Sequence, residues 1–403
     1  FILTIASYSN KLRTYLSKAN MAEDVVNKFS NLIPRMPYRE DKLFGVIFFF
    51  VFTLPLIFVP LIEDAFETPK FIFYLLMVGV ILVVFAFQRK MIKLPPRVVL
   101  IAGLLFFASI VISTIFSIDI RNSLFGLVGR SSNSALFLIG WLILVWIMYS
   151  ALSREKLLTL LKAVVVGGLI MAVYGLLQQE GWLFYSGLDP GTRLFIPSLM
   201  GNPNFTSMYL AMVVPLSLYY SVISRTIVAR AFYFASAAIM VWATVQTASR
   251  AAILGLVAAL ITVVVVLIAR KTWQRLVVFS LISLGLTIVF SYYALTVYRP
   301  QTLTNTIEFQ DVTQQFRFAV WDLAIEVIKD KPIVGSGLGN FILEFQHYGW
   351  SPFSAGEWFD DPHNVFLLLA ANGGVAMGLS FIVLIGSILL LGFVHTKEDV
   401  LLY

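Results

Sequence analysis

The chain has 403 residues, of which 59% are hydrophobic and 13% charged, and its mean hydropathy is +0.87. No water-soluble domain of this size could bury so much apolar surface in one core, so the composition excludes a soluble globular protein. The absence of cysteine excludes disulfides, thiolate catalysis and cysteine-bound zinc. The net charge of +7 could suggest a nucleic-acid partner, but in a membrane protein the distribution of basic residues sets topology, and we expect no nucleic acid.

The N-terminal segment, residues 1–42, precedes the first apolar stretch and lacks the pattern of a cleavable signal peptide, so the first span is expected to serve as the signal. Leu12, Leu16 and Ala19 recur at helical spacing beside Lys18. This pattern fits an amphipathic helix on the cytoplasmic leaflet, and a solvated basic tail is the alternative.

Ten apolar stretches follow, each with roughly the 20 residues that a bilayer-spanning helix needs. The predicted spans are residues 43–62, 71–88, 97–117, 134–151, 157–178, 203–223, 230–247, 250–269, 274–296 and 363–393. They predict an all-α polytopic fold with a membrane domain over residues 43–296 and a further span with a cytoplasmic end over residues 363–403. The last stretch is long enough to begin outside the membrane or to break at Gly373 and Gly374, and the chain is expected to be truncated.

The distribution of basic residues predicts how these spans are oriented in the membrane. With the N-terminus inside, every short inside turn is basic, and most of the 29 Lys and Arg residues lie on the inside. The outside segments hold Lys70, Arg121, Arg130, Arg193, Arg250, Arg299, Arg317, Lys329 and Lys331. The positive-inside rule therefore predicts that the intervening loops face the periplasm or the cell exterior.

One external loop, residues 297–362, is long enough to fold by itself. Apolar residues recur at helical spacing from Val312 to Ile328, which predicts an amphipathic helix that Pro332 stops. The glycine-rich stretch 335–339 has no preceding strand and no following Gly-Lys-Ser or Gly-Lys-Thr, so it predicts a flexible helix-ending turn rather than a phosphate loop.

Three inward-running spans begin with residues that cap helices. The predicted caps are Asn202 before Pro203, Thr247 or Ser249 before Arg250, and Asp361 before Pro362, the last placing His363 and Asn364 in the first helical turn. By the predicted topology all three helix N-termini face outward, where their free N–H groups favour an anion.

Three arginines are expected at the same level as these helix ends. Arg193 precedes the sixth span, Arg250 opens the eighth, and Arg317 lies one turn before Trp321 on the external helix. Guanidinium groups and helix N-termini both bind phosphate oxygens, so a pyrophosphate is the ligand that fits best. Solvated loop positions for Arg193 and Arg317, and a snorkelling Arg250, are the alternatives.

His363 is one of three histidines and is the candidate general base. A simple helix-capping or interfacial role is the alternative. Glu357, Asp360 and Asp361 could join His363 in binding a metal, but proline interrupts the run and no standard spacing of metal ligands appears, so we expect no metal.

Taken together, these motifs resemble the O-antigen ligase and polymerase superfamily. The residues that carry the resemblance are Gly201-Asn202-Pro203-Asn204, Thr247-Ala248-Ser249-Arg250, the Arg317 to Trp321 helix that runs into Pro332, the Gly335 to Gly339 turn, and His363-Asn364 with Gly374 ten residues beyond. The resemblance covers roughly residues 45–393. It implies a multispan architecture of the lipid-sugar glycosyltransferase type, called GT-C-like.

The resemblance also implies a reaction and its residues. The donor would be an undecaprenyl-pyrophosphate-linked glycan, with Arg193, Arg250 and Arg317 at its pyrophosphate and His363 activating the acceptor hydroxyl. Arg250 and His363 would be catalytic. The supporting residues would be Asn202, Asn204, Ser249, Trp321 and Asn364. The transfer would invert the anomeric carbon and would need no metal and no cofactor.

Other functions remain open at this level. The acceptor could be lipid-anchored, as in an O-antigen ligase, or a growing glycan or a protein, as in a polymerase or an O-oligosaccharyltransferase. A transporter or flippase for lipid-linked sugars could use similar helix ends, but the spans carry almost no charge at their middles. A structural scaffold would leave the arginines and His363 unexplained. The expected location is the bacterial inner membrane, with the site facing outward.

Overall fold

The computed structural model describes residues 41–88, 92–181, 197–247, 249–269, 312–348 and 359–395, with single helical positions at 281 and 285. In these ranges every regular element is a helix, and the only strand-like pairing is an isolated bridge between Leu127 and Arg130. Arg193 lies outside the described residues, as do nearly all of segment 1–42 and all of the predicted span 274–296 except residues 281 and 285.

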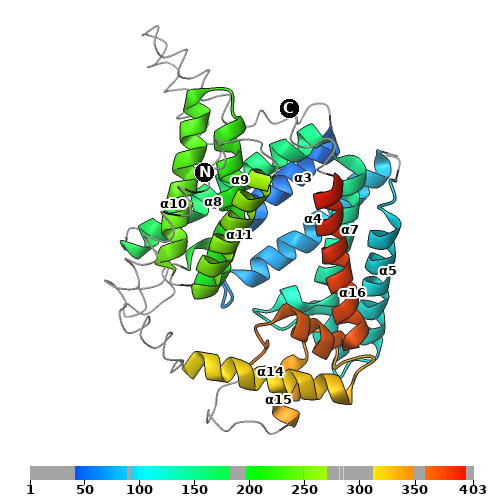
Figure 1. Cartoon of the computed structure of the whole chain (residues 1–403). Coiled ribbons are helices and arrows are strands. Elements are labelled where there is room, and N and C mark those ends of the chain that lie inside the picture. Colours follow the sequence, from blue (N-terminus) through cyan, green and yellow to red (C-terminus); the bar gives the residue numbers. More distant parts are fainter. Residues whose placement is uncertain are drawn as a thin grey trace. The chain divides into compact units, whose positions relative to one another are not determined.

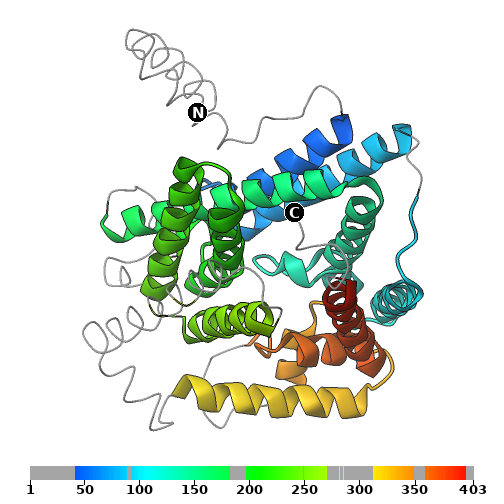
Figure 2. The same ribbon diagram turned by 45° about the horizontal axis from the view of Figure 1, so that its top comes forward.

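The chain divides into two compact units (Figures 1 and 2). The first unit comprises residues 1–58 and 153–300, and the second comprises residues 59–152 and 301–403. Each unit therefore takes chain from both halves of the sequence. The domain boundaries predicted from topology remain a prediction.

Six helices in the described residues are long and apolar enough to cross a membrane. They are α4 (Glu67–Phe87), α5 (Arg97–Ile115), α8 (Arg154–Gln179), α9 (Pro203–Ile223), α10 (Ile227–Gln246) and α16 (Val365–His395). Shorter apolar helices are α3 (Lys42–Thr53), extended by η1 (Leu54–Leu56), α7 (Ala135–Ala151) and α11 (Arg250–Ala269). Every predicted span that falls in the described residues overlaps one of these helices, which confirms an all-α polytopic membrane fold.

The first predicted span, residues 43–62, is too long. Helix α3 has 12 residues and passes into a single 3₁₀ turn that contains Pro55. Proline has no N–H to donate to the preceding turn, and Pro60 follows in the loop. An α-helix of this length measures about 18 Å, well below the roughly 30 Å of a bilayer core.

The core of the first unit forms where α8, α9 and α10 pack together. Helices α9 and α10 run side by side (Figure 1), and the Ser217 hydroxyl of α9 donates to the Tyr233 carbonyl of α10 at 2.7 Å. Gly168 permits the close approach of α8, because a Cβ there would lie 2.9 Å from Cγ1 of Val213 and 3.0 Å from Sδ of Met240. Asn202 caps α9 and Pro203 is its first residue, as predicted.

The second unit packs α5 against α16 and α4 against α7. Phe106 and Ile110 of α5 are fully buried, as is Met377 of α16. The Tyr74 hydroxyl of α4 donates to the Phe137 carbonyl of α7 at 2.8 Å. The short helix α6 (Ile120–Phe125) connects α5 to the loop before α7.

The amphipathic helix predicted in the external loop is α14 (Val312–Asp330), which ends two residues before Pro332. The predicted apolar positions with described burial are Ala319, Val320, Leu323, Val327 and Ile328, and the first four are at most 8% exposed. They pack against α15 (Phe341–His347) and the N-terminal part of α16, across which α14 runs in Figures 1 and 2.

The Gly335 to Gly339 stretch ends the helix as predicted and also fixes a break in α16. Gly374 has φ 78° and ψ 171°, which confirms the predicted break. The Gly337 N–H donates to the Asn372 carbonyl and the Val375 N–H to the Pro332 carbonyl, both at 2.8 Å. The turn is thus held against α16 by backbone hydrogen bonds, which the prediction of a flexible turn did not include.

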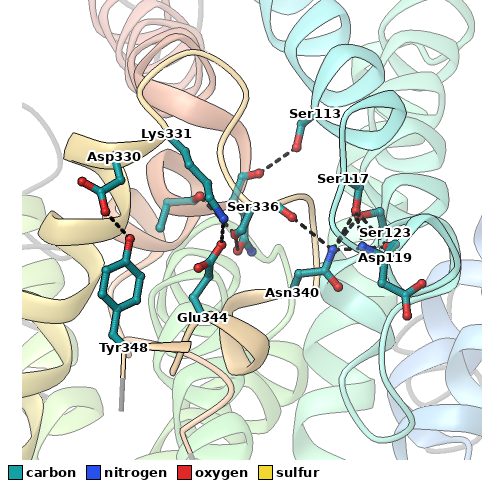
Figure 3. Close-up of polar contacts among 12 residues, drawn as sticks. Ser113, Ser117, Asp119, Ser123, Asp330, Lys331, Ser336, Asn340, Glu344 and Tyr348 are labelled. Atoms are coloured by element: carbon teal, nitrogen blue, oxygen red, sulfur yellow. Dashed lines mark hydrogen bonds and ion pairs between the residues drawn. The ribbon is translucent and has the colours of Figure 1, made fainter. Parts of the chain in front are cut away.

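Polar side chains bind the same turn to the end of α5 (Figure 3). The Asn340 amide donates to the Ser117 hydroxyl at 2.7 Å and to the Asp119 carbonyl at 3.2 Å. The Ser113 hydroxyl donates to the Asn372 carbonyl at 2.7 Å. Three segments distant in sequence therefore meet beside the break in α16.

Candidate functional site

His363 lies in the last turn of chain before α16. The Asn364 side chain accepts hydrogen bonds from the N–H groups of Phe366 at 3.1 Å and Leu367 at 3.3 Å, so Asn364 is the N-cap of α16. The prediction that Asp361 caps this helix, with His363 and Asn364 in its first turn, is wrong. The Asp361 carboxylate instead accepts the His363 N–H, and the helix begins after Asn364.

The backbone of His363 is in the left-handed region, with φ 53°. Among the described residues only Ser198 is another non-glycine residue with positive φ. This conformation costs free energy in a residue with a Cβ, and such positions are concentrated at functional sites. The side chain of His363 is exposed, and its ring meets that of Phe359 edge-on at 6.3 Å between centroids.

Two other elements hold the loop that contains His363. The Trp321 indole N–H of α14 donates to the Pro362 carbonyl at 2.8 Å. The Arg130 guanidinium, from the loop between α6 and α7, pairs with the Asp360 carboxylate. The loop is thus anchored at Asp360 and Pro362 by side chains from separate parts of the sequence.

Arg317 is exposed on α14, one turn before Trp321. Residues four apart share a helix face, with Cβ atoms about 6 Å apart. The ring of Phe318, 58% exposed, meets that of Trp321 edge-on at 5.5 Å between centroids. Arg317 therefore lies one helical turn from the side chain that contacts Pro362.

The remaining described candidates belong to the first unit. Arg250 is half-buried and is the first residue of α11. The Ser249 carbonyl accepts the Ile253 N–H at 3.1 Å, so Ser249 lies at the N-cap position of α11, but its buried hydroxyl has no hydrogen-bond partner among the described residues. The Thr247 hydroxyl accepts the Ser249 N–H at 3.3 Å, which forms a turn just before the helix.

At the start of α9, the Asn202 side chain accepts the Asn204 N–H at 2.8 Å, and Asn204 is exposed. The second unit thus brings together Trp321, His363 and Asn364, with Arg317 on the same helix as Trp321, and the first unit holds Asn202, Asn204, Ser249 and Arg250. The meeting of these two groups in one site remains a prediction.

The sequence reasoning did not single out Arg130 as a site residue, and it considered Asp360 only as a metal ligand. Burial alone would lower the pKa of Arg130, but the facing Asp360 carboxylate raises it. Burial raises the pKa of Asp361, and the charge of Arg130 opposes that rise. The signal in the sequence was an arginine in a short outside loop, which was used only to set topology.

Within the described ranges, no three His, Asp or Glu side chains are grouped so that they could hold a metal ion. Glu357 lies outside these ranges. Metal independence remains a prediction for a chelation experiment.

Part of the chain is similar to a known protein family. Residues 235–383 match the family model described as O-Antigen ligase. This stretch includes Arg250, Arg317, Trp321 and His363, whereas Arg193 and Asn202 precede it. No curated protein matches the chain. Over residues 235–383, the chain is therefore similar to the O-antigen ligase family.

Proposed function

We propose that the protein is a glycosyltransferase that moves a glycan from an undecaprenyl-pyrophosphate carrier to an acceptor hydroxyl at the outer face of the bacterial inner membrane. The observation that carries the proposal is His363, exposed and held in a left-handed conformation within the matched O-antigen ligase region. A family match without such a residue would support membership but no mechanism.

His363 is the general base in this proposal. An imidazole nitrogen takes the proton of the acceptor hydroxyl while the oxygen forms a bond to the anomeric carbon. The bond from that carbon to the pyrophosphate oxygen breaks on the opposite face, so the configuration inverts. Undecaprenyl pyrophosphate leaves with the bonding electrons.

The arginines stabilise the charge on the leaving pyrophosphate. Arg250 lies at the N-terminal end of α11, where a cationic side chain and the backbone N–H groups of the first helical turn both interact favourably with phosphate oxygens. The buried hydroxyl of Ser249 supports the assignment, because it has no partner among the described residues and such a buried polar atom is typical of a site completed by a ligand. Arg193 and Arg317 are the further donor contacts.

The test is glycan transfer by the purified chain in detergent or lipid, with an undecaprenyl-pyrophosphate oligosaccharide and a panel of lipid-anchored, glycan and protein acceptors. We expect transfer that continues in EDTA and inversion at the new glycosidic bond. Arg250→Ala should lower the rate about 100-fold or more through loss of charge stabilisation. Arg225→Ala, an exposed arginine between α9 and α10 of the same unit, is the control.

The hydroxyl that accepts the glycan distinguishes a ligase from a polymerase or an O-oligosaccharyltransferase. Transfer to a lipid-anchored acceptor supports a ligase, whereas transfer to a glycan chain or a protein supports a polymerase or an O-oligosaccharyltransferase. Translocation of the lipid-linked sugar in vesicles without transfer to any acceptor would overturn the proposal in favour of a transporter.

A further inference from the structure

Arg130 projects from a turn whose backbone is tightly specified. The Arg130 N–H donates to the Leu127 carbonyl at 2.9 Å, which closes the turn. Gly126 has φ 78°, and a Cβ at this position would lie 2.6 Å from Cα of Ser131 and 2.9 Å from the Arg130 carbonyl oxygen. Only glycine fits there, so the position of the Arg130 backbone is fixed by its neighbours.

The same turn is anchored to the start of α4. The backbone N–H and the hydroxyl of Ser132 donate to one carboxylate oxygen of Glu67, at 3.0 and 3.1 Å. Asp64 caps α4 by accepting the Glu67 N–H at 3.0 Å. The carboxylates that act on the Arg130 guanidinium are those of Asp360, Glu67 and Asp361.

Arg130 is linked to His363 through a short series of contacts. Arg130 pairs with Asp360, the next residue Asp361 accepts the His363 N–H, and Trp321 holds the intervening Pro362 carbonyl. The side chains of Arg130 and Asp360 are 33% and 25% exposed, so the pair is partly shielded from water. The Arg130 charge also acts on the Asp361 carboxylate, in the direction that keeps it ionised and able to accept the His363 N–H.

We propose that Arg130 is a positioning residue for the transfer reaction, which holds the loop of His363 in its left-handed conformation through the ion pair with Asp360. The inference rests on the proposed function of His363. Arg130 is assigned to positioning rather than to the donor pyrophosphate because its guanidinium already pairs with a carboxylate of the protein.

The experiment measures kcat, the KM for the acceptor and the Kd for the donor in Arg130→Met, Arg130→Lys, Asp360→Asn and the double variant Arg130→Met/Asp360→Asn. Small displacements of a catalytic group can cost about 100-fold in rate, so we expect kcat to fall by about 10- to 100-fold in Arg130→Met. The donor Kd and the thermal midpoint should stay near those of the wild type.

Two comparisons separate positioning from general stability. Arg130→Lys keeps the charge and should recover part of kcat. The double variant should be no slower than Arg130→Met alone, because both changes break one ion pair. Arg121→Met, which removes an exposed arginine of nearby α6, is the matched control and should leave kcat unchanged.

Three results would overturn the inference while wild-type transfer stands: unchanged kcat in Arg130→Met, a weakened donor Kd with unchanged kcat, or activity that falls only in step with the thermal midpoint. Asp360→Asn breaks the same pair if the Arg130 variants do not fold. A wild-type protein that transfers no glycan would instead overturn the proposed function.

Discussion

The loop of His363 has hydrogen-bond or charge partners in two other places in the second unit, whereas the buried hydroxyl of Ser249, beside Arg250 in the first unit, has none among the described residues. A general base must be held in place before its substrate arrives, and protein contacts can do this. A group that binds an anion can be satisfied by the ligand itself. Under the proposed function, this difference predicts that the acceptor side is preorganised and that the donor side is completed by its substrate.

The largest loss of stability is expected from a substitution at Gly374, where α16 is broken. Gly374→Ala would place a Cβ 2.2 Å from the Ile333 carbonyl oxygen at a φ of 78°. We expect a loss of about 3 kcal/mol in unfolding free energy, because strain and a backbone clash act together. Gly386→Ala in the same helix meets open space and is the control, with an expected gain of up to about 1 kcal/mol. Equal thermal midpoints for the two variants would contradict this account of the break.

A smaller effect is expected from weakening the hold on the loop. Trp321→Phe removes the hydrogen bond to Pro362, which is worth about 1 kcal/mol, and should lower kcat about fivefold with the donor Kd unchanged. Trp146→Phe removes a comparable bond to the Lys93 carbonyl in the same unit and should leave kcat unchanged. Parallel losses of kcat in both variants would show that the loop has no special dependence on Trp321.

A smaller effect again is expected at Asp361, and it depends on pH. Burial raises the pKa of this carboxyl, so the folded state binds the proton more tightly than the unfolded state and loses stability as pH rises above the ordinary range for aspartate. Asp361→Asn should therefore raise the thermal midpoint at pH 7 and have less effect near pH 4. Asp322→Asn, at an exposed position of α14, serves as the control. A midpoint that rises equally at both pH values would contradict the assignment.

The smallest effect on stability is expected at the donor side. Ser249→Ala removes a hydroxyl that has no partner in the described part of the chain, so the thermal midpoint should hardly change while the donor Kd rises a few-fold. Ser217→Ala removes a buried hydroxyl that bonds the Tyr233 carbonyl and should cost about 1 kcal/mol with no change in donor Kd. A destabilised Ser249→Ala with unchanged donor binding would contradict a role for Ser249 in holding the donor.

The helices were predictable because apolar length and caps are local properties of the sequence. Asn202 before Pro203 gave the start of α9, and the spacing of Val320, Leu323 and Val327 gave the buried face of α14. The early end of α3 at Pro55 was missed because the apolar run continues past the proline.

The site was predictable in residue type but not in its contacts. His363 and Trp321 could be selected from their motifs, yet the bond from Trp321 to Pro362 joins residues 41 apart. Arg130 and Asp360 are 230 positions apart in the sequence, and no local sequence pattern predicts a contact between such distant residues. The cap of α16 was misassigned because Asp361 and Asn364 are both good capping residues, and the left-handed backbone of His363 decides between them.

The most direct test of separate acceptor and donor roles for His363 and Arg250 is to measure donor binding and glycan transfer in His363→Asn and Arg250→Ala. Asparagine removes the imidazole and tolerates a positive φ, so the backbone of the loop can be kept. His347→Asn, at another exposed histidine of the second unit, is the control. We predict that His363→Asn binds the donor like the wild type but transfers glycan about 100- to 10,000-fold more slowly, whereas Arg250→Ala loses donor binding as well. Transfer by His363→Asn at the wild-type rate would contradict the account.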